Sequence, residues 1–219
     1  MTQKDPQPVS VTAPVRKAHP RLSKVANARD TIAGFGRDVG VMGLTFGQFS
    51  LLDLIDAVLE ITGPADVLIG TWSAGFYDVD AAVRWRDSGR MRSIRFVMDS
   101  SDKRGQSTPG DVSELFGADA VRVTRSHAKF VLISNDDGWR AVITTSMNLN
   151  KNTRIEHFDL VDDPDRFALL WDFADALWQE LPAGSTGDRT LPGVMSVASV
   201  RPNYGVAVAE RIAVGPWVQ

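Results

Sequence analysis

The chain has 219 residues, no cysteine and a formal net charge of −3 at neutral pH. A chain of this length that is 43% hydrophobic can bury one substantial core, so a single folded domain is the simplest expectation. The lack of cysteine excludes disulfide bonds, thiol catalysis and thiolate metal sites, and the acidic balance excludes a global positive field that would attract nucleic acid.

The N-terminal residues, 1–33, are expected to form a basic, proline-containing arm outside the folded domain. Six basic and only two acidic side chains lie within residues 1–30. Such an arm can contact phosphate groups, although a solvated, disordered terminus is the more economical interpretation. The first residues lack the apolar core of a signal peptide, and no apolar run is long enough to span a bilayer. We therefore expect a cytoplasmic protein without membrane insertion.

A glycine-rich segment follows over residues 34–47. Its glycine spacing does not match a phosphate-binding loop and no clear strand precedes it, so an irregular loop or a short strand is expected. The first regular element is a helix predicted over residues 50–62. Ser50 and Asp53 have the spacing of a capping box, and a Gly-Pro pair ends the helical pattern.

The rest of the chain alternates between strand and helix patterns. Strands are predicted over 66–72, 93–99, 120–125, 129–134, 140–145 and 156–161, and helices over 80–88, 113–116 and 165–180. This order predicts an α/β fold with a mixed β-sheet flanked by helices. Residues 182–219 form a C-terminal extension that could be packed on the domain or across a dimer.

The most informative segment runs from His127 to Glu156. His127 and Lys129 lie two positions apart in a predicted apolar strand, and side chains at such positions share one face. Burying the ammonium of Lys129 in that strand is costly without a partner, so an anionic group is expected beside it. The alternative for His127 is a strand histidine whose ring is satisfied by a backbone group.

Three further residues of this segment have groups that suit phosphate chemistry. A neutral imidazole can attack phosphorus, while an ammonium and an amide can hold the phosphate oxygens. Ser146, Asn148 and Glu156 add a hydroxyl, an amide and a carboxylate at the end of the second predicted strand and beyond. Asn148 could instead be a simple turn residue, and Glu156 an edge-strand charge.

The segment resembles the signature of the phospholipase D superfamily, H-x-K-x4-D-x6-G-S-x-N. The resemblance implies that His127 is the nucleophile and that Lys129 and Asn148 are phosphate ligands. It also makes Ser146 the motif serine, and places Glu156 where many members carry a glutamate that hydrogen-bonds an active-site histidine.

The sequence departs from that signature in three ways. Ser134 stands at the position of the motif aspartate, Thr145 stands at that of the glycine, and the hairpin between them is four residues longer. The resemblance is strongest over residues 120–162 and extends, by element order, over 49–180. It implies a phospholipase D-like domain over residues 34–181, with the catalytic competence in question at Ser134.

The family resemblance also implies a mechanism and a partner. Members use two histidines, and small members with one H-x-K motif pair two copies across a two-fold axis. The expected protein is a homodimeric, metal-independent phosphodiesterase without a cofactor, a nuclease that cleaves DNA or RNA through a phosphohistidine intermediate. The alternatives are a phospholipase acting on lipid phosphodiesters and a catalytically weak module that binds nucleic acid or a partner protein.

Two other places are predicted to bind substrate. Trp72 and Ser73 end the first predicted strand of the α/β region, and Lys103 and Arg104 lie in the loop after the second. Strand ends in open α/β sheets are where ligands commonly bind. For Lys103 and Arg104, a solvated loop is the competing interpretation.

Overall fold

The computed structural model describes residues 9–14, 28–100, 107–149 and 154–184. The chain separates into two units, residues 1–189 and residues 190–219, and all of the second lies outside the described ranges. The predicted C-terminal extension is therefore described only over its first three residues, where Gly184 N donates to Val121 O at 3.2 Å.

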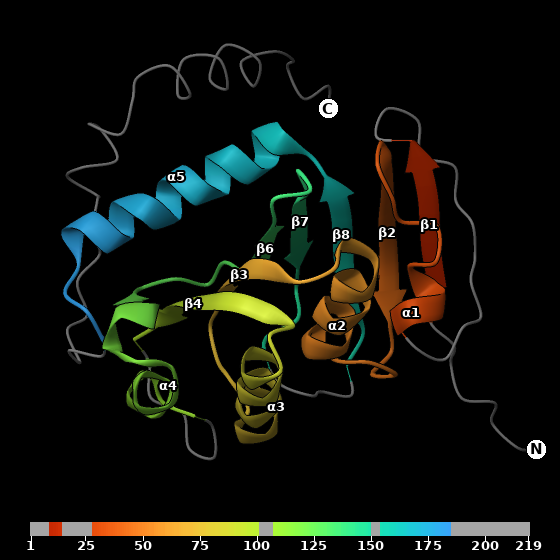
Figure 1. The fold of residues 1–219 in the computed structure, drawn as a ribbon. Helices are drawn as coiled ribbons and strands as arrows, with labels where there is room; N and C mark the ends of the chain where they lie inside the picture. The colour runs from red at the N-terminus through yellow and green to blue at the C-terminus, as the bar shows by residue number, and fades with distance from the viewer. Residues whose placement is uncertain (1–8, 15–27, 101–106, 150–153, 185–219) are drawn as a thin grey trace, which may run out of the picture. The chain divides into compact units, whose positions relative to one another are not determined.

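An eight-stranded sheet forms the centre of the described structure, with the strand order β1-β2-β8-β7-β6-β3-β4-β5 (Figure 1). Strands β3, β4 and β5 are parallel to one another, and every other neighbouring pair is antiparallel. The predicted α/β class with a mixed sheet is thus confirmed. The strands are β1 Val9–Pro14, β2 Val39–Thr45, β3 Ala65–Thr71, β4 Met91–Asp99, β5 Val121–Thr124, β6 Phe130–Ser134, β7 Arg140–Thr145 and β8 Glu156–Asp162.

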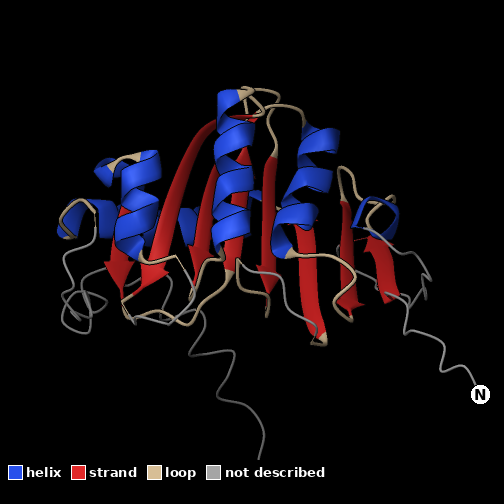
Figure 2. Ribbon diagram, turned by 90° about the horizontal axis from the view of Figure 1, so that it is seen from below, coloured by secondary structure: helices blue, strands red, loops and turns tan. Residues whose placement is uncertain are grey.

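Helices cover both faces of this sheet. Helices α2 and α3 lie on one face and α5 crosses the other, which gives three layers (Figures 1 and 2). None of the helices in the described ranges is both long and apolar enough to cross a bilayer. The helices are α1 Ala28–Thr31, α2 Leu51–Thr62, α3 Phe76–Asp87, α4 Pro109–Phe116 and α5 Pro164–Glu180, with a 3₁₀ turn η1 at Ala118–Ala120.

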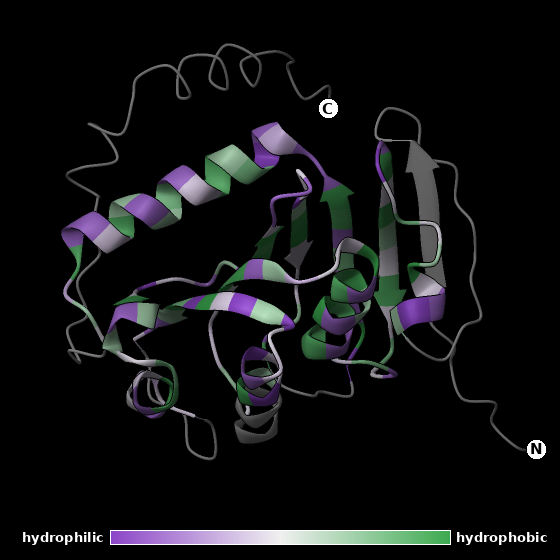
Figure 3. Cartoon of the chain, in the orientation of Figure 1, coloured by the Kyte–Doolittle hydropathy of each residue, from purple (hydrophilic) through white to green (hydrophobic). Residues whose placement is uncertain are grey.

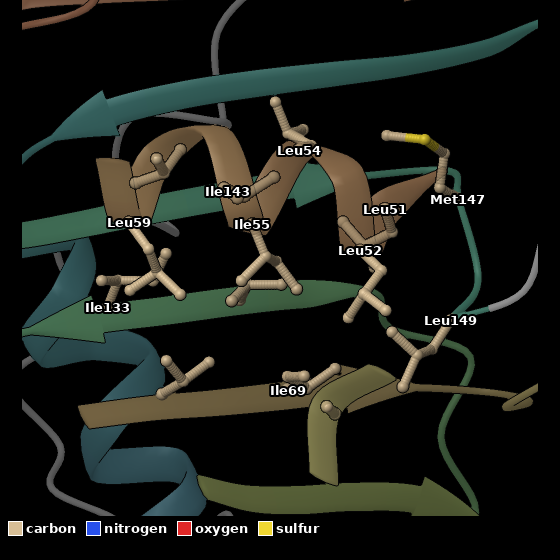
Figure 4. Packing of buried hydrophobic residues seen from close by; sticks show 14 of the residues in the cluster. Leu51, Leu52, Leu54, Ile55, Leu59, Ile69, Ile133, Ile143, Met147 and Leu149 are labelled. Carbon is tan, nitrogen blue, oxygen red and sulfur yellow. The ribbon is translucent and has the colours of Figure 1, made fainter. Parts of the chain in front are cut away.

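Helix α2 packs the larger core against the sheet. Its start is the predicted capping box, in which Ser50 Oγ accepts from Asp53 N at 3.2 Å and Asp53 Oδ2 accepts from Ser50 N at 2.7 Å. The helix ends at Gly63, whose φ of 77° is a conformation that glycine adopts without strain. Figure 4 shows the apolar side chains of the helix facing those of β3, β6 and β7, among them Leu51, Leu54, Ile55, Leu59, Ile69, Ile133 and Ile143.

Helix α5 packs a second, smaller core on the opposite face. Asp163 caps it by accepting from the amides of Asp165 and Arg166, both at 3.0 Å, and Pro164 occupies its first turn. Hydrophilic and hydrophobic positions alternate along the helix in Figure 3, and its apolar face packs on the sheet. The buried contacts include Phe167, Ala174 and Leu177 with Leu68, Leu132 and Val142.

Part of the predicted N-terminal arm belongs to the sheet, so the expectation of disorder is wrong for residues 9–14. Strand β1 pairs antiparallel with β2, from Val9 opposite Leu44 to Pro14 opposite Val39. The sequence of residues 9–14 alone does not predict this strand, because an edge strand is stable only when it pairs with its neighbour. That neighbour, β2, lies in the glycine-rich segment for which the sequence left loop and strand open.

The remaining predicted elements are present, with shifted starts. Helix α3 begins at Phe76 and α4 at Pro109, both earlier than predicted. For α4 the overlooked signal is a second capping box, in which Thr108 Oγ1 accepts from Asp111 N at 3.2 Å. The helix ends at Gly117, as predicted.

Candidate active site

The polar residues of the candidate site gather at one edge of the sheet, because strand direction brings particular strand ends together. The C-terminal ends of β2, β3, β4 and β7 meet the N-terminal ends of β6 and β8 there. The register shows this directly: Thr45 pairs with Glu156, and Gly70 pairs with Phe130.

His127 and Lys129 lie before β6 and not within it, which corrects the predicted strand. Two backbone amides of this segment donate to side chains, whereas the amides of a strand would donate to the backbone carbonyls of a neighbouring strand. Ser126 N donates to Asp99 Oδ2 at 3.0 Å, and Ala128 N donates to Ser126 Oγ at 3.2 Å. His127 is exposed and Lys129 half-buried, so the predicted burial of Lys129 in an apolar strand is also wrong.

The two side chains nevertheless contact each other. Lys129 Nζ lies 3.1 Å from His127 Nδ1 and 3.4 Å from Nε2, and it donates to the His127 carbonyl at 2.8 Å. A lysine ammonium only donates, so this contact suits a neutral imidazole with a lone pair on the ring nitrogen. A neutral ring is the form that can act as a nucleophile.

Trp72 and Asp99 support this pair. The rings of Trp72 and His127 have centroids 5.0 Å apart, and Lys129 Nζ lies 5.7 Å from the Trp72 ring centroid. Trp72 Nε1 donates to Asp99 Oδ1 at 3.1 Å, while the other oxygen of this carboxylate accepts from Ser126 N. Asp99 thus fixes both the indole and the segment that carries His127.

Sequence reasoning missed Asp99, although a signal was present. It is the last residue of β4, and the strand-end argument that selected Trp72 applies equally to it.

Ser146 and Glu156 form a second contact at this edge. Ser146 Oγ donates to Glu156 Oε2 and accepts from His157 N at 3.0 Å. Thr145 Oγ1 also donates to His157 O, at 2.6 Å. Because a hydroxyl has one hydrogen, Ser146 cannot donate to Glu156 and to a phosphate oxygen at once. Ser146 therefore holds Glu156 in place in this structure.

Asn148 is held at the end of β3 by its neighbour in the chain. Leu149 N donates to Thr71 Oγ1 at 3.1 Å, and Gly75 N donates to Leu149 O at 2.6 Å. Met147 and Leu149 are buried on either side, as Figure 4 shows at the end of the α2 core. Asn148 Oδ1 is buried and has no hydrogen-bond partner among the described residues.

Ser134, at the position of the motif aspartate, lies at the other edge of the sheet. The five residue steps from Lys129 to Ser134 span about 17 Å of extended chain. There Ser134 pairs with Asp66 on β3 and not with any residue of the candidate site.

The structure thus brings together His127, Lys129 and Trp72, and pairs Ser146 with Glu156. The predicted substrate-binding residue Ser73 is 6% exposed, which leaves little of it to touch a substrate. Lys103 and Arg104 lie outside the described residues. Within the described ranges, no three His, Asp or Glu side chains are grouped so that they could hold a metal ion.

Comparison with known proteins gives structural similarity alone. No family model and no curated protein sequence matches the chain. Among solved structures, NucT from Helicobacter pylori is 16% identical, with a TM-score of 0.46 over 66% of this chain and 99% of its own. Nuc from Salmonella typhimurium, a phospholipase D family member, is 14% identical, with a TM-score of 0.44 over 69% of this chain and 98% of its own.

A polyphosphate kinase from Porphyromonas gingivalis is 11% identical, with a TM-score of 0.47 over 70% of this chain and 27% of its own.

Proposed function

We propose that the protein is a metal-independent phosphodiesterase that cleaves DNA or RNA through a phosphohistidine intermediate. The observation that carries this proposal is the contact of the exposed His127 imidazole with the Lys129 ammonium at the sheet edge. A neutral imidazole is able to attack phosphorus, and an ammonium beside it is able to hold the oxygens of the group under attack, which supports the proposal.

In the first step, a ring nitrogen of His127 attacks phosphorus, a nitrogen–phosphorus bond forms, and the bond to the leaving oxygen breaks. Lys129 moves its ammonium from the imidazole to a non-bridging phosphate oxygen. The Asn148 amide, held by its neighbour Leu149, donates to another. The charge that develops on these oxygens is then stabilised by the Lys129 ammonium and the Asn148 amide.

The leaving oxygen needs a proton, and the chain has a single H-x-K pair. We propose that a second copy supplies it across a two-fold axis, so that two His127 rings face one phosphate. The protonated ring of the second copy gives its proton to the leaving oxygen. It then takes a proton from water as the water oxygen attacks phosphorus, the nitrogen–phosphorus bond breaks, and His127 returns to its neutral form.

The other residues of the edge act on these groups and not on the phosphate. Asp99 positions Trp72 and the segment carrying His127, and Ser146 orients the Glu156 carboxylate. Glu156 would accept a hydrogen bond from the ring of a histidine in the assembled site, which fixes the ring's orientation.

The test is cleavage of labelled single- and double-stranded DNA and RNA in EDTA. We expect wild type to cleave at least one of these substrates, and His127→Ala to lose about a thousandfold or more of the rate. The matched control is His157→Ala, which removes an exposed histidine at the start of β8 that makes no contact with Lys129. This variant should cleave like wild type.

Two results would count against the proposal. Equal cleavage by wild type and His127→Ala would remove His127 from the chemistry. If a folded wild-type protein cleaved no nucleic acid, the remaining alternative would be the catalytically weak binding module. Binding of the same labelled strands by His127→Ala would support that alternative.

A further inference from the structure

A cavity of about 270 Å³ opens beneath α5, on the sheet face that α5 covers and at the edge remote from His127. Its floor is formed by residues that pair across β6, β3 and β4. Asp66 of β3 pairs with Ser93 of β4 and Ser134 of β6, and one step inward Leu68 pairs with Arg95 and Leu132. Phe167 and Trp171 of α5 also line the cavity. Its outer row is therefore polar, and its inner row combines the apolar Leu68 and Leu132 with the charged Arg95.

The aromatic side of the cavity is rigid. The rings of Phe167 and Trp171 are stacked, with centroids 5.9 Å apart and an interplanar angle of 13°. Phe167 is buried and belongs to the core under α5 together with Leu68 and Leu132. A compact apolar group entering the cavity would meet a surface that is already ordered, which lowers the entropy cost of binding.

Arg95 gives the cavity its charge. Its guanidinium lies 5.7 Å from the Trp171 ring centroid and 5.5 Å from that of Trp178. It has no hydrogen bond or ion pair with any residue in the described ranges. The carboxylate of Asp66 is already occupied, since Arg92 Nη2 and Ser93 Oγ both donate to it at 2.7 Å. The donors of Arg95 are thus available to a ligand.

A second guanidinium, that of Arg122, lies near Trp178 as Arg95 does, although Arg122 does not line the cavity. Arg122 is 6% exposed, lies 4.9 Å from the Trp178 ring centroid and donates only to backbone carbonyls; its Nε is buried without a partner among the described residues. Burial lowers the pKa of Arg122, the nearby Asp119 opposes this, and the charge of Arg95 lowers it further. Two guanidinium groups thus stand near one indole without a carboxylate bound to either.

We propose that this cavity binds a small organic anion. Its phosphate or carboxylate group binds Arg95, and its compact apolar body lies on Leu68, Leu132 and the rings of Phe167 and Trp171. Guanidinium groups bind both kinds of oxyanion in the same two-pronged geometry, so the recognised chemistry is shared. The site is separate from the His127 edge and does not depend on the proposed cleavage activity.

The first test is calorimetric titration of the full chain carrying Lys129→Ala, which weakens phosphate binding at the other edge. Phenyl phosphate and benzoate are the anionic probes, and benzyl alcohol is the neutral one. We expect at least one anion to bind with one site per chain and the alcohol not to bind. The anion that binds with the higher affinity shows whether the site prefers a phosphate or a carboxylate group. Adding Arg95→Gln should weaken that anion at least about tenfold.

A matched pair of substitutions at Ser134 tests the effect of charge in the cavity without changing Arg95. Ser134→Asp would add a negative charge to the lining of the cavity and should weaken the anion at least about tenfold, whereas Ser134→Asn, of the same shape, should stay within about threefold of the parent. Thermal unfolding of each variant checks the fold, and the Ser134 pair decides the question if Arg95→Gln does not fold.

The proposal fails if neither anion binds, if benzyl alcohol binds as well as they do, or if Ser134→Asp and Ser134→Asn bind alike. Nucleic acid cleavage by the Ser134→Asn variant with Lys129 intact should equal that of wild type. Failure of one site is therefore measured independently of failure of the other.

Discussion

At the scale of single residues, Asp99 connects parts of the candidate site that are distant in sequence. One carboxylate oxygen accepts from the Trp72 indole and the other from Ser126 N, so each oxygen binds a different part of the site. The Trp72 ring in turn contacts the ring of His127, with the two centroids 5.0 Å apart and the planes tilted by 51°. The position of the proposed nucleophile thus depends on a residue that need not touch the substrate.

The substitution Asp99→Asn tests this positioning role. An asparagine has one acceptor oxygen where the carboxylate has two, so one of the two hydrogen bonds is lost and an amide group faces an N–H donor. We expect kcat to fall about 10- to 100-fold with KM nearly unchanged, and the free energy of unfolding to fall by about 1–3 kcal/mol.

The control for this variant is Asp87→Asn, which removes an exposed carboxylate at the end of α3 and should leave both constants unchanged. A rise of KM with kcat preserved would show that Asp99 acts on substrate binding and not on the position of His127.

Some of the site could be predicted from the sequence and some could not. The spacing of His127 and Lys129 predicted that their side chains share one side, and in the structure they contact each other, although the strand assumed for them begins only at Phe130. The role of Asp99 could not be predicted, because a hydrogen bond between residues 27 positions apart depends on how β3 and β4 pair. Likewise, only the structure shows that the Ser146 hydroxyl is engaged by Glu156.

At the scale of elements, the contact between β3 and β6 sets where β6 begins and where the segment with His127 ends. Gly70 of β3 pairs with Phe130, the first residue of β6, and the Phe130 ring lies across the face of the glycine. A Cβ at position 70 would come within 2.4 Å of that ring. Phe130, which directly follows Lys129, therefore packs over a position where any residue with a Cβ atom would clash with its ring.

Gly70→Ala should accordingly destabilise the protein and disturb the site. We expect the free energy of unfolding to fall by about 1–3 kcal/mol from overpacking, together with a loss of cleavage as Phe130 shifts the segment before it. Gly36→Ala is the control, since a Cβ there meets nothing within 4 Å. Urea unfolding of both variants measures the difference, and equal midpoints would contradict this account of Gly70.

Elements with local signals were predictable and elements without them were not. The capping residues Ser50 and Asp163 mark two helix starts in the sequence, and both have that role in the structure. Strand β1 has no such signal, because its place at the sheet edge is decided by pairing with β2. The ends of a helix are set by nearby residues, whereas the partner of a strand is set by the whole fold.

At the scale of the whole molecule, the proposed homodimer makes a quantitative prediction about mixed assemblies. Wild type and His127→Ala would be co-refolded in equal amounts so that the copies exchange. If two His127 rings share one site, mixed dimers are inactive and about one quarter of the wild-type activity remains, whereas independent sites leave about one half. Mixing with His157→Ala should leave full activity, and light scattering reports the mass of the assembly.

The sheet order has a further consequence for the time course of folding. Strand β2 lies early in the chain, yet its neighbours are β1 and the last strand, β8. Closing a loop of that size is slow compared with forming α2 or the β6–β7 hairpin. Glu156 reaches Thr45 only when this long-range pair forms. A nascent chain would therefore hold His127 and Lys129 in place before Glu156 joins them, so the complete candidate site would be a late product of synthesis.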